Sequence, residues 1–125
     1  MHELSMAQSI MDSVLDNAEK NNATSVTSVT LEIGTLAMLN PEQVKFLLNV
    51  LKEDTIAENA EFIIEEIPVK IKCRDCGYEG GAIVDDTDHY APMVNCPKCN
   101  TYRVDITNGK DVIVKNISIE IPEDN

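Results

Sequence analysis

The sequence predicts an α+β fold in which two helices pack on a three-stranded sheet, with a small module that holds every cysteine inserted between the second and third strands. Helical and strand-like patterns alternate in the order helix, strand, helix, strand, and a final strand follows a stretch rich in Gly, Asp and Cys. Two helices that cover one face of such a sheet bury the apolar side of each element. The core must be aliphatic, because aromatic residues make up only 4% of the chain and Trp is absent.

The first helix and the first strand are predicted from two different periodicities. Apolar residues recur at steps of three and four between residue 4 and about residue 20, namely Leu4, Ala7, Met11, Val14, Leu15 and Ala18. In SVTSVTLEIG, residues 25–34, Val29, Leu31 and Ile33 alternate with polar residues. We therefore expect a helix with one buried stripe, followed by a strand with one buried face.

The second helix has the clearest start signal in the chain. Asn40 can cap it, Pro41 suits the first helical position, and Gln43 completes a capping box. The expected buried stripe of this helix is Val44, Leu47, Leu48 and Leu51.

Two further strands are expected on either side of the cysteines. In AEFIIEEIPVKIKC, residues 60–73, one face of the expected strand carries Ile63, Ile67, Val69 and Ile71 together with Glu65. Phe62 and Ile64 indicate that the other face of this strand is partly covered as well. After the cysteines, DVIVKNISIEI is the third strand, in which polar residues alternate with Ile117, Ile119 and Ile121.

The character of the chain changes at Lys72. Residues 72–101 are poor in periodic apolar residues, so we expect that they cannot bury a core of their own and that something else must hold them. The predicted organisation is an α+β domain made of residues 1–71 and 102–125, with a metal-binding module made of residues 72–101.

The four cysteines form two C-x2-C pairs with the spacing of a zinc ribbon. Cys73 and Cys76 are separated by nineteen residues from Cys96 and Cys99. Each pair turns tightly, the first with a following Gly77, and aims two thiolates at one point, so two pairs complete a tetrahedron around Zn(II). Metal binding would supply folding free energy to this segment. A closed four-sulfur site has no open position, so the zinc would be structural.

Other uses of the four cysteines are less favoured, and one stays open. Two disulfides are disfavoured because we expect a cytoplasmic protein, whose thiols stay reduced. A thioredoxin-like redox motif is disfavoured because there are two pairs and no βαβ unit. Iron stays open, because CRDCGYEG and CPKC also resemble rubredoxin knuckles, and softness and tetrahedral geometry do not separate iron from zinc.

Composition and charge exclude several classes of function. The net charge of −12 argues against binding to duplex nucleic acid and to an anionic membrane surface. We see no secretory signal and no apolar run of transmembrane length, so we expect the cytoplasm. We see no Ser-His-Asp set, no Cys-His set and no phosphate-binding loop, so we do not expect an enzyme.

A second metal site is indicated by the start of the chain, MHELSMAQSI. The terminal amine of Met1 and the amide and imidazole nitrogens of His2 can bind one metal in a nearly planar arrangement, which Ni(II) and Cu(II) prefer. The amide of Glu3 or the imidazole of His89, the second of two histidines, could fill the remaining position. The plain alternative is that His2 is a solvated residue before a helix and that His89 is a polar loop residue.

Taken together, MHELSMAQSI, LEIGTL and the IEEIP strand that leads into the cysteine quartet resemble the HypA family over essentially the full chain. These proteins are metallochaperones of [NiFe]-hydrogenase and urease maturation. The resemblance implies a nickel site built on His2, with Glu3 part of the motif, and a structural zinc site of four cysteines. It also implies a HypB-type GTPase as partner, with nickel passing to the hydrogenase large subunit or the urease apparatus. The nineteen-residue gap is longer than in many bacterial members, and histidines often found beside their cysteines are missing.

We therefore expect a cytoplasmic nickel carrier that holds structural Zn(II), transports Ni(II), and binds neither nucleic acid nor membrane. A monomer and a homodimer are both compatible with the sequence, because a module hung between two strands could exchange between protomers. The alternative function is a zinc-ribbon protein-interaction adaptor without a nickel site, in which His2 would be dispensable. The sequence does not decide whether the target enzyme is a hydrogenase or a urease.

Overall fold

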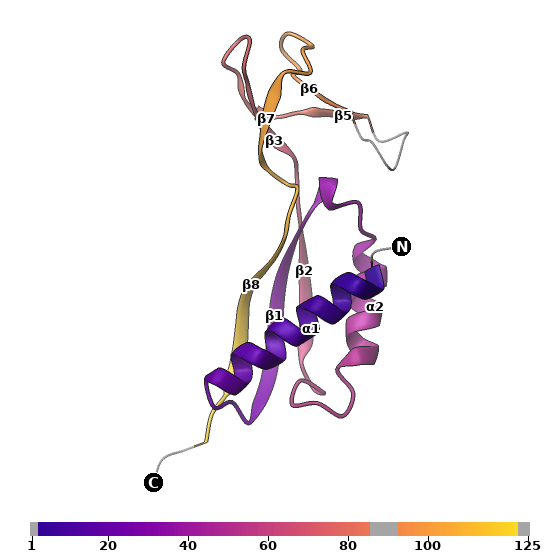
Figure 1. The fold of residues 1–125 in the computed structure, drawn as a ribbon, viewed down its shortest axis with the longest axis vertical. Coiled ribbons are helices and arrows are strands. Elements are labelled where there is room, and N and C mark those ends of the chain that lie inside the picture. The colour runs from indigo at the N-terminus through magenta and orange to yellow at the C-terminus, as the bar shows by residue number, and fades with distance from the viewer. Residues whose placement is uncertain (1–2, 86–92, 123–125) are drawn as a thin grey trace. The chain divides into compact units, whose positions relative to one another are not determined.

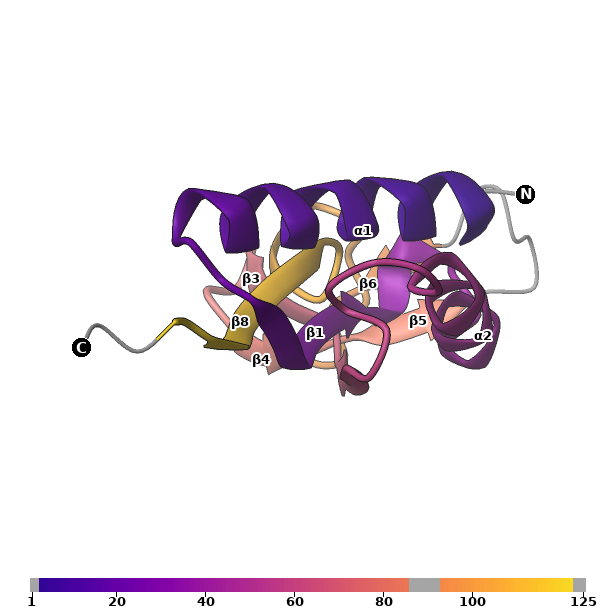
Figure 2. The ribbon, with the colours of Figure 1, turned by 90° about the horizontal axis from the view of Figure 1, so that it is seen from below.

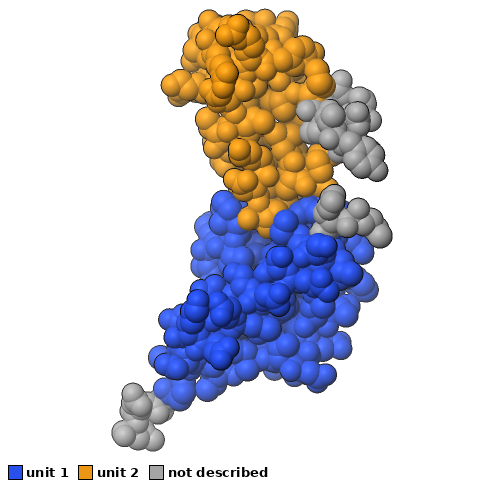
Figure 3. All heavy atoms as spheres, viewed as in Figure 1, with its two compact units in different colours: residues 1–32, 39–65, 113–125 blue, residues 33–38, 66–112 orange. Residues whose placement is uncertain are grey.

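The computed structural model describes residues 3–85 and 93–122, which form two helices, a short 3-10 helix and eight strands (Figure 1). In chain order these are α1 (Glu3–Lys20), β1 (Ser25–Gly34), the 3-10 helix (Thr35–Ala37), α2 (Pro41–Leu51), β2 (Glu61–Ile67), β3 (Lys70–Cys73), β4 (Glu79–Gly81), β5 (Ile83–Asp85), β6 (Met93–Asn95), β7 (Val104–Asn108) and β8 (Val112–Glu120). The predicted α+β class is confirmed. The chain divides into two compact units, shown in different colours in Figure 3.

Unit 1 comprises residues 1–32, 39–65 and 113–125 and contains the three-stranded sheet β2-β1-β8 with both helices. Hydrogen bonds join Thr24 to Glu120 and Thr27 to Ser118, so β8 runs antiparallel to β1. Helices α1 and α2 pack against each other, and α1 lies across the sheet (Figure 2). The buried aliphatic and aromatic side chains of this unit are Ala7, Ile10, Met11, Val14, Ala18, Val26, Val29, Leu31, Val44, Leu48, Ala57, Ala60 and Phe62.

Unit 2 comprises residues 33–38 and 66–112 and contains the cysteines. Its sheets have the strand orders β4-β3-β7 and β5-β6, and every pairing in them is antiparallel. Its core consists of Val69, Ile71, Cys73 and Cys96, with partly buried aliphatic residues and Tyr78 packed around them. The expectation that residues 72–101 cannot bury a core of their own agrees with this cluster. Its buried aliphatic members, Val69 and Ile71, lie outside that range, and the two buried members inside it are cysteines.

The predicted second strand is split, and its buried face is the opposite of the expected one. Phe62 is 1% exposed, whereas Ile63 is 40% exposed. Because side chains alternate between the faces of a strand, burial of Phe62 turns Ile63 to the other face. Pro68 then interrupts the segment, because it has no N–H to continue a ladder. Val69 and Ile71 are buried in unit 2 instead.

Smaller differences concern single positions in α1 and β1. Leu4, expected in the buried stripe of α1, is 49% exposed, and Ile10 takes part in the core. Thr30 of β1 is buried beside the predicted apolar residues. The module boundaries at 72 and 101 remain a prediction. The compact unit defined by packing is wider than that module.

Candidate metal centres

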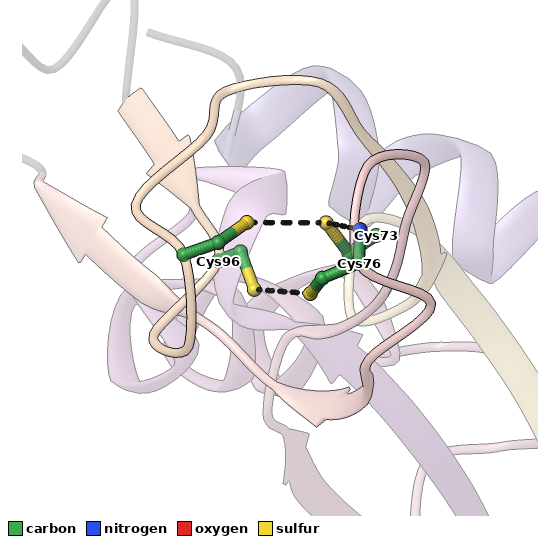
Figure 4. Close-up of side chains that lie close together, drawn as sticks. Cys73, Cys76 and Cys96 are labelled. Atoms are coloured by element: carbon green, nitrogen blue, oxygen red, sulfur yellow. Dashed lines mark hydrogen bonds between the residues drawn. The ribbon is translucent and has the colours of Figure 1, made fainter.

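The four cysteine thiols converge on one point in unit 2 (Figure 4). Cys73 ends β3 and Cys96 follows β6, while Cys76 and Cys99 lie in the turns that come next. The Sγ atoms of Cys73 and Cys99 are 3.6 Å apart, those of Cys76 and Cys96 are 3.7 Å apart, and all four lie within 4.8 Å of one another. Each close contact joins one C-x2-C pair to the other, and all four thiols are free.

The spacing of these sulfur atoms fits a tetrahedral tetrathiolate site. With a zinc–sulfur distance of about 2.3 Å, the edge of a regular tetrahedron of sulfur atoms is about 3.8 Å. The two printed contacts of 3.6 and 3.7 Å are close to that edge. The donor set, four thiols with no competing oxygen ligand among them, suits a soft or borderline metal. The arrangement therefore fits the predicted structural zinc site.

The two cysteine turns are built in the same way. Four backbone hydrogen bonds define them, from Gly77 to Cys73 (3.2 Å), from Asn100 to Cys96 (2.8 Å), from Cys73 to Tyr78 (2.8 Å) and from Cys96 to Thr101 (3.0 Å). Gly77 and Asn100, which follow the second cysteine of each pair, have φ angles of +77° and +62°. Glycine adopts this left-handed conformation freely, and asparagine is one of the residues that tolerate it. Gly77 was predicted from the sequence, whereas Asn100 was not, although Asn100 has the same offset from its cysteine.

Backbone N–H groups and neighbouring thiols shift the cysteine pKa values in opposite directions. The N–H of Cys76 donates to Sγ of Cys73 at 3.3 Å, and this contact is the main reason that the pKa of Cys73 is lowered to about 7. For Cys99 the N–H of Thr101 acts to lower the pKa, but burial and the three other thiols together raise it to about 12. Four crowded thiols therefore do not all ionise near neutral pH, whereas a divalent cation among them would favour the thiolates.

Ion pairs connect the first cysteine turn to β7 and to the residue just before that strand. Arg74 donates from Nε (3.0 Å) and from a terminal guanidinium nitrogen (2.6 Å) to Oδ1 of Asp105, and these hydrogen bonds lower the pKa of Asp105. Asp75 pairs with Arg103 at 3.6 Å, and the Arg74 N–H donates to the Arg103 carbonyl oxygen. Both residues between Cys73 and Cys76 are therefore held in place from outside the turn.

The predicted nickel residues are only partly within the described chain. Met1, His2 and His89 lie outside the described residues, and Glu3 is the first residue of α1. The Glu3 carboxylate accepts a hydrogen bond from the backbone N–H of Asn40 at 3.3 Å. An anionic group at the start of α2 is favourable, because the N-terminus of a helix carries partial positive charge.

The start of α2 confirms the predicted cap and corrects the predicted capping box. Oδ1 of Asn40 accepts from the N–H groups of Glu42 (3.0 Å) and Gln43 (3.2 Å), as an N-cap residue does. In a capping box the side chain of Gln43 would accept the N–H of Asn40. That N–H is donated to Glu3 instead. The cap of α2 therefore joins the beginning of the chain to residue 40, a link with no local sequence signal.

No helix within residues 3–85 and 93–122 is both long and apolar enough to cross a bilayer.

Comparison with known proteins identifies similar chains over the full length. The profile of one family, described as "Hydrogenase/urease nickel incorporation, metallochaperone, hypA", matches residues 1–119. The hydrogenase maturation factor HypA of Methanobrevibacter smithii is 62% identical over 124 residues, which cover 99% of each chain. The corresponding factor of Methanothermobacter thermautotrophicus is 52% identical over 120 residues, covering 96% of this chain and 98% of the relative.

A solved structure shares the fold. The solution structure of the Ni metallochaperone HypA from Helicobacter pylori superimposes with a TM-score of 0.69 at 22% identity, covering 98% of this chain and all of the other. At that identity the similarity supports the fold and carries no inference about individual site residues.

Proposed function

The chain belongs to the HypA family of hydrogenase and urease nickel-incorporation metallochaperones, and from this premise we propose that it binds Ni(II) at its N-terminus and delivers it during maturation of a [NiFe]-hydrogenase or a urease. The resemblance found in the sequence is confirmed, and the zinc-ribbon adaptor is not favoured. Transport of nickel requires no catalytic step, which agrees with a chain whose thiols fit a closed metal site.

The observation that carries the proposal is the match of residues 1–119 to the family profile, and the hydrogen bond between Glu3 and the cap of α2 adds a structural detail beside the proposed site. Through this bond the residue next to His2 is attached to the N-terminus of α2. The proposed ligands are the amine of Met1 and the amide and imidazole nitrogens of His2, with the Glu3 amide or the His89 imidazole as the fourth donor. Nitrogen donors in one plane suit Ni(II). A chelate at a chain terminus can also be taken apart donor by donor, so a partner that supplies better ligands can remove the metal.

We propose that the resident metal is Zn(II), held by Cys73, Cys76, Cys96 and Cys99. When bound, it supplies the positive charge that four adjacent thiolates require and joins the two turns. The side chains that hold these turns in place are Arg74 and Asp75, through their ion pairs. Iron in the same position would give a coloured protein, whereas zinc would not, so an absorption spectrum of the purified protein separates the two metals.

The remaining parts of the proposal follow from the family. We propose that a HypB-type GTPase exchanges nickel with this chain in the cytoplasm, before the metal reaches the hydrogenase large subunit or the urease apparatus. Neither a nucleic acid nor a membrane is expected as partner, because the chain carries a net charge of −12. A monomer and a homodimer both suit this function.

Calorimetric titration with Ni(II) tests the nickel site. Four zinc-loaded samples are compared, namely the intact chain, His2→Ala, a chain with four Gly ahead of Met1, and His89→Ala. The four added residues convert the Met1 amine into an amide and place the new terminal amine too far from His2 to share its chelate. We expect His2→Ala and the extended chain to lose one stoichiometric site with unchanged zinc content, because both remove a donor of the chelate. The result for His89→Ala decides whether the fourth donor is the imidazole of His89. Equal binding by the intact chain, His2→Ala and the extended chain would refute the N-terminal site.

Two further titrations test how the site depends on Glu3 and on protonation. Glu3→Ala should lower the nickel affinity more than Glu3→Gln, because glutamine keeps an oxygen that can accept the N–H of Asn40. The affinity of the intact chain should fall as the pH is lowered from neutral, because an amine, an amide and an imidazole must all lack protons to bind. An affinity that is independent of pH in this range would contradict the proposed ligands.

A further inference from the structure

The edge of the unit 1 sheet that β8 forms is open among the described strands. β8 is nine residues long and has β1 as its neighbour in the order β2-β1-β8. The carbonyl oxygen of Glu120 accepts a hydrogen bond from the backbone N–H of Thr24, just before β1, and that of Ser118 accepts one from the hydroxyl of Thr27 in β1. Consecutive residues of a strand direct their backbone groups to opposite sides. The N–H and C=O groups of Ile117 and Ile119 therefore face away from β1, along the free edge.

The two edges of this sheet differ in how they are protected against pairing. The β2 edge carries three charged residues among seven, Glu61, Glu65 and Glu66, and charges on an edge strand oppose the addition of another strand. β8 carries only Lys115 and Glu120 among nine residues. Lys115 lies 3.3 Å from the Glu65 carboxylate, so its charge is already paired. The longer edge is thus the less protected one.

A groove of about 330 Å³ lies beside this edge, between α1 and β8. One wall is polar and comes from α1, with Ser13, Asn17 and Asn21. The other is largely aliphatic and comes from β8, with Val114, Ile117 and Ile119. A strand added to β8 would present every second side chain to the side where α1 lies.

The hydrogen bonds of the groove leave acceptors on its polar wall. The amide nitrogen of Asn17 donates to the Ser13 carbonyl oxygen (2.8 Å), and that of Asn21 donates to the Asn17 carbonyl oxygen (2.7 Å). The side-chain oxygens of both asparagines remain able to accept hydrogen bonds from a ligand, beside the Ser13 hydroxyl and the second amide hydrogen of Asn21. Unit 1 also holds 14 of the 22 acidic residues of the chain and four of the ten basic ones. These surroundings favour an occupant that donates hydrogen bonds and carries positive charge.

We propose that β8 binds an extended segment of a partner protein by strand addition, and that this segment carries lysine or arginine together with apolar side chains that enter the groove beside α1. The binding surface uses none of the proposed metal ligands. A second copy of this chain fits less well, because it would bring the same acidic surplus to the interface.

The test uses the zinc-loaded full-length chain and a fluorescently labelled probe peptide of about eight residues in which lysine and valine alternate. Two control peptides carry glutamate in place of lysine, or a methyl group on every backbone amide. Two protein variants are compared with the intact chain. Ser13→Trp fills the groove, and Gln8→Trp is a matched control, because Gln8 is an exposed neutral residue of α1 outside the groove. Circular dichroism and zinc content establish that both variants fold.

We expect the lysine–valine peptide to bind, and its affinity to fall by at least about tenfold on charge inversion, on N-methylation and in Ser13→Trp, but not in Gln8→Trp. Absence of binding by this peptide would overturn the proposal. Equal binding of the N-methylated peptide would overturn it as well, whatever the fate of Ser13→Trp, because strand addition requires backbone N–H groups. Sedimentation that reveals a dimer of the intact chain, lost in Ser13→Trp alone, would assign the edge to a second copy instead.

Discussion

Three glycines of unit 2 allow steric crowding and backbone strain to be measured separately. Gly34 has an ordinary φ of −71°, but a Cβ there would lie 2.2 Å from the carbonyl carbon and oxygen of Gly109. Gly77 has a φ of +77°, and an added Cβ would meet nothing within 4 Å. Gly81 has neither problem. Gly34→Ala therefore tests steric crowding alone, and Gly77→Ala tests backbone strain alone. Gly81→Ala introduces neither effect and is the control.

The expected losses of stability follow from these distances. Carbon atoms in contact are normally about 3.5–4.0 Å apart, so Gly34→Ala must move two backbone segments apart by more than about 1 Å. The Gly34 N–H donates to the Asp111 carbonyl oxygen at 2.9 Å, and such a displacement breaks that bond. Overpacking and one lost hydrogen bond together cost about 3 kcal/mol. Gly77→Ala places an L-residue in the left-handed region, at about 1–2 kcal/mol. Gly81→Ala should change stability by less than about 0.5 kcal/mol.

The assay is urea unfolding of the zinc-loaded variants, followed by far-ultraviolet circular dichroism. The urea concentration at the midpoint of unfolding should be highest for Gly81→Ala, lower for Gly77→Ala and lowest for Gly34→Ala. Because Gly77 directly follows Cys76, its alanine variant should also release zinc to a chromogenic chelator faster than Gly81→Ala does. A midpoint for Gly34→Ala equal to that of Gly81→Ala would refute the close approach of Gly34 and Gly109. An unchanged rate of zinc release in Gly77→Ala would refute the assigned role of the left-handed turn.

Three further predictions concern zinc binding, a helix cap and an ion pair. With the pKa of Cys73 lowered to about 7 and that of Cys99 raised to about 12, the metal-free chain keeps thiol protons at neutral pH, so zinc must displace them. Below about pH 7 the Cys73 thiol is protonated as well, so zinc must displace one more proton. Zinc affinity should therefore fall as the pH is lowered from about 8 to about 5, as measured by competition with a chelator. Asn40→Ala removes the cap of α2 and should lower the free energy of unfolding by about 1 kcal/mol in urea unfolding. Arg74→Ala should raise the pKa of Asp105 toward its usual value, as followed by NMR titration, and should cost less than about 1 kcal/mol of stability, because both side chains are more than half exposed.

Each of these predictions has an outcome that contradicts its premise. A zinc affinity independent of pH would mean that the thiols are already ionised before the metal binds. An Asn40→Ala variant as stable as the intact chain would mean that the cap contributes nothing, for which Asn49→Ala, within the same helix, is the control. An unchanged pKa of Asp105 in Arg74→Ala would show that the ion pair is absent in solution.

Much of this protein could be predicted from local patterns, because those patterns report on interactions between residues close in sequence. The helical period placed α1, the N-cap and proline signal placed the start of α2, and the alternation in residues 25–34 placed β1. The paired C-x2-C spacing predicted the convergence of four thiols, since each turn sets the direction of its own two sulfur atoms. The resemblance to the HypA family likewise depended on short motifs read in order.

Tertiary structure decided the features that depend on residues far apart in the chain. The buried face of β2 could not be chosen from its own sequence, because both faces carry apolar residues, and only packing buries Phe62 and exposes Ile63. The core around Cys73 and Cys96 needed Val69 and Ile71 from a segment that the sequence assigned to the other domain. The link from Glu3 to Asn40 spans 37 residues, and no local pattern reports a bond between a side chain and a distant backbone N–H. The sequence by itself determined which chemical groups are present and which turns present them, whereas folding determined which of these groups meet, because contacts between distant segments are fixed only when the whole chain packs.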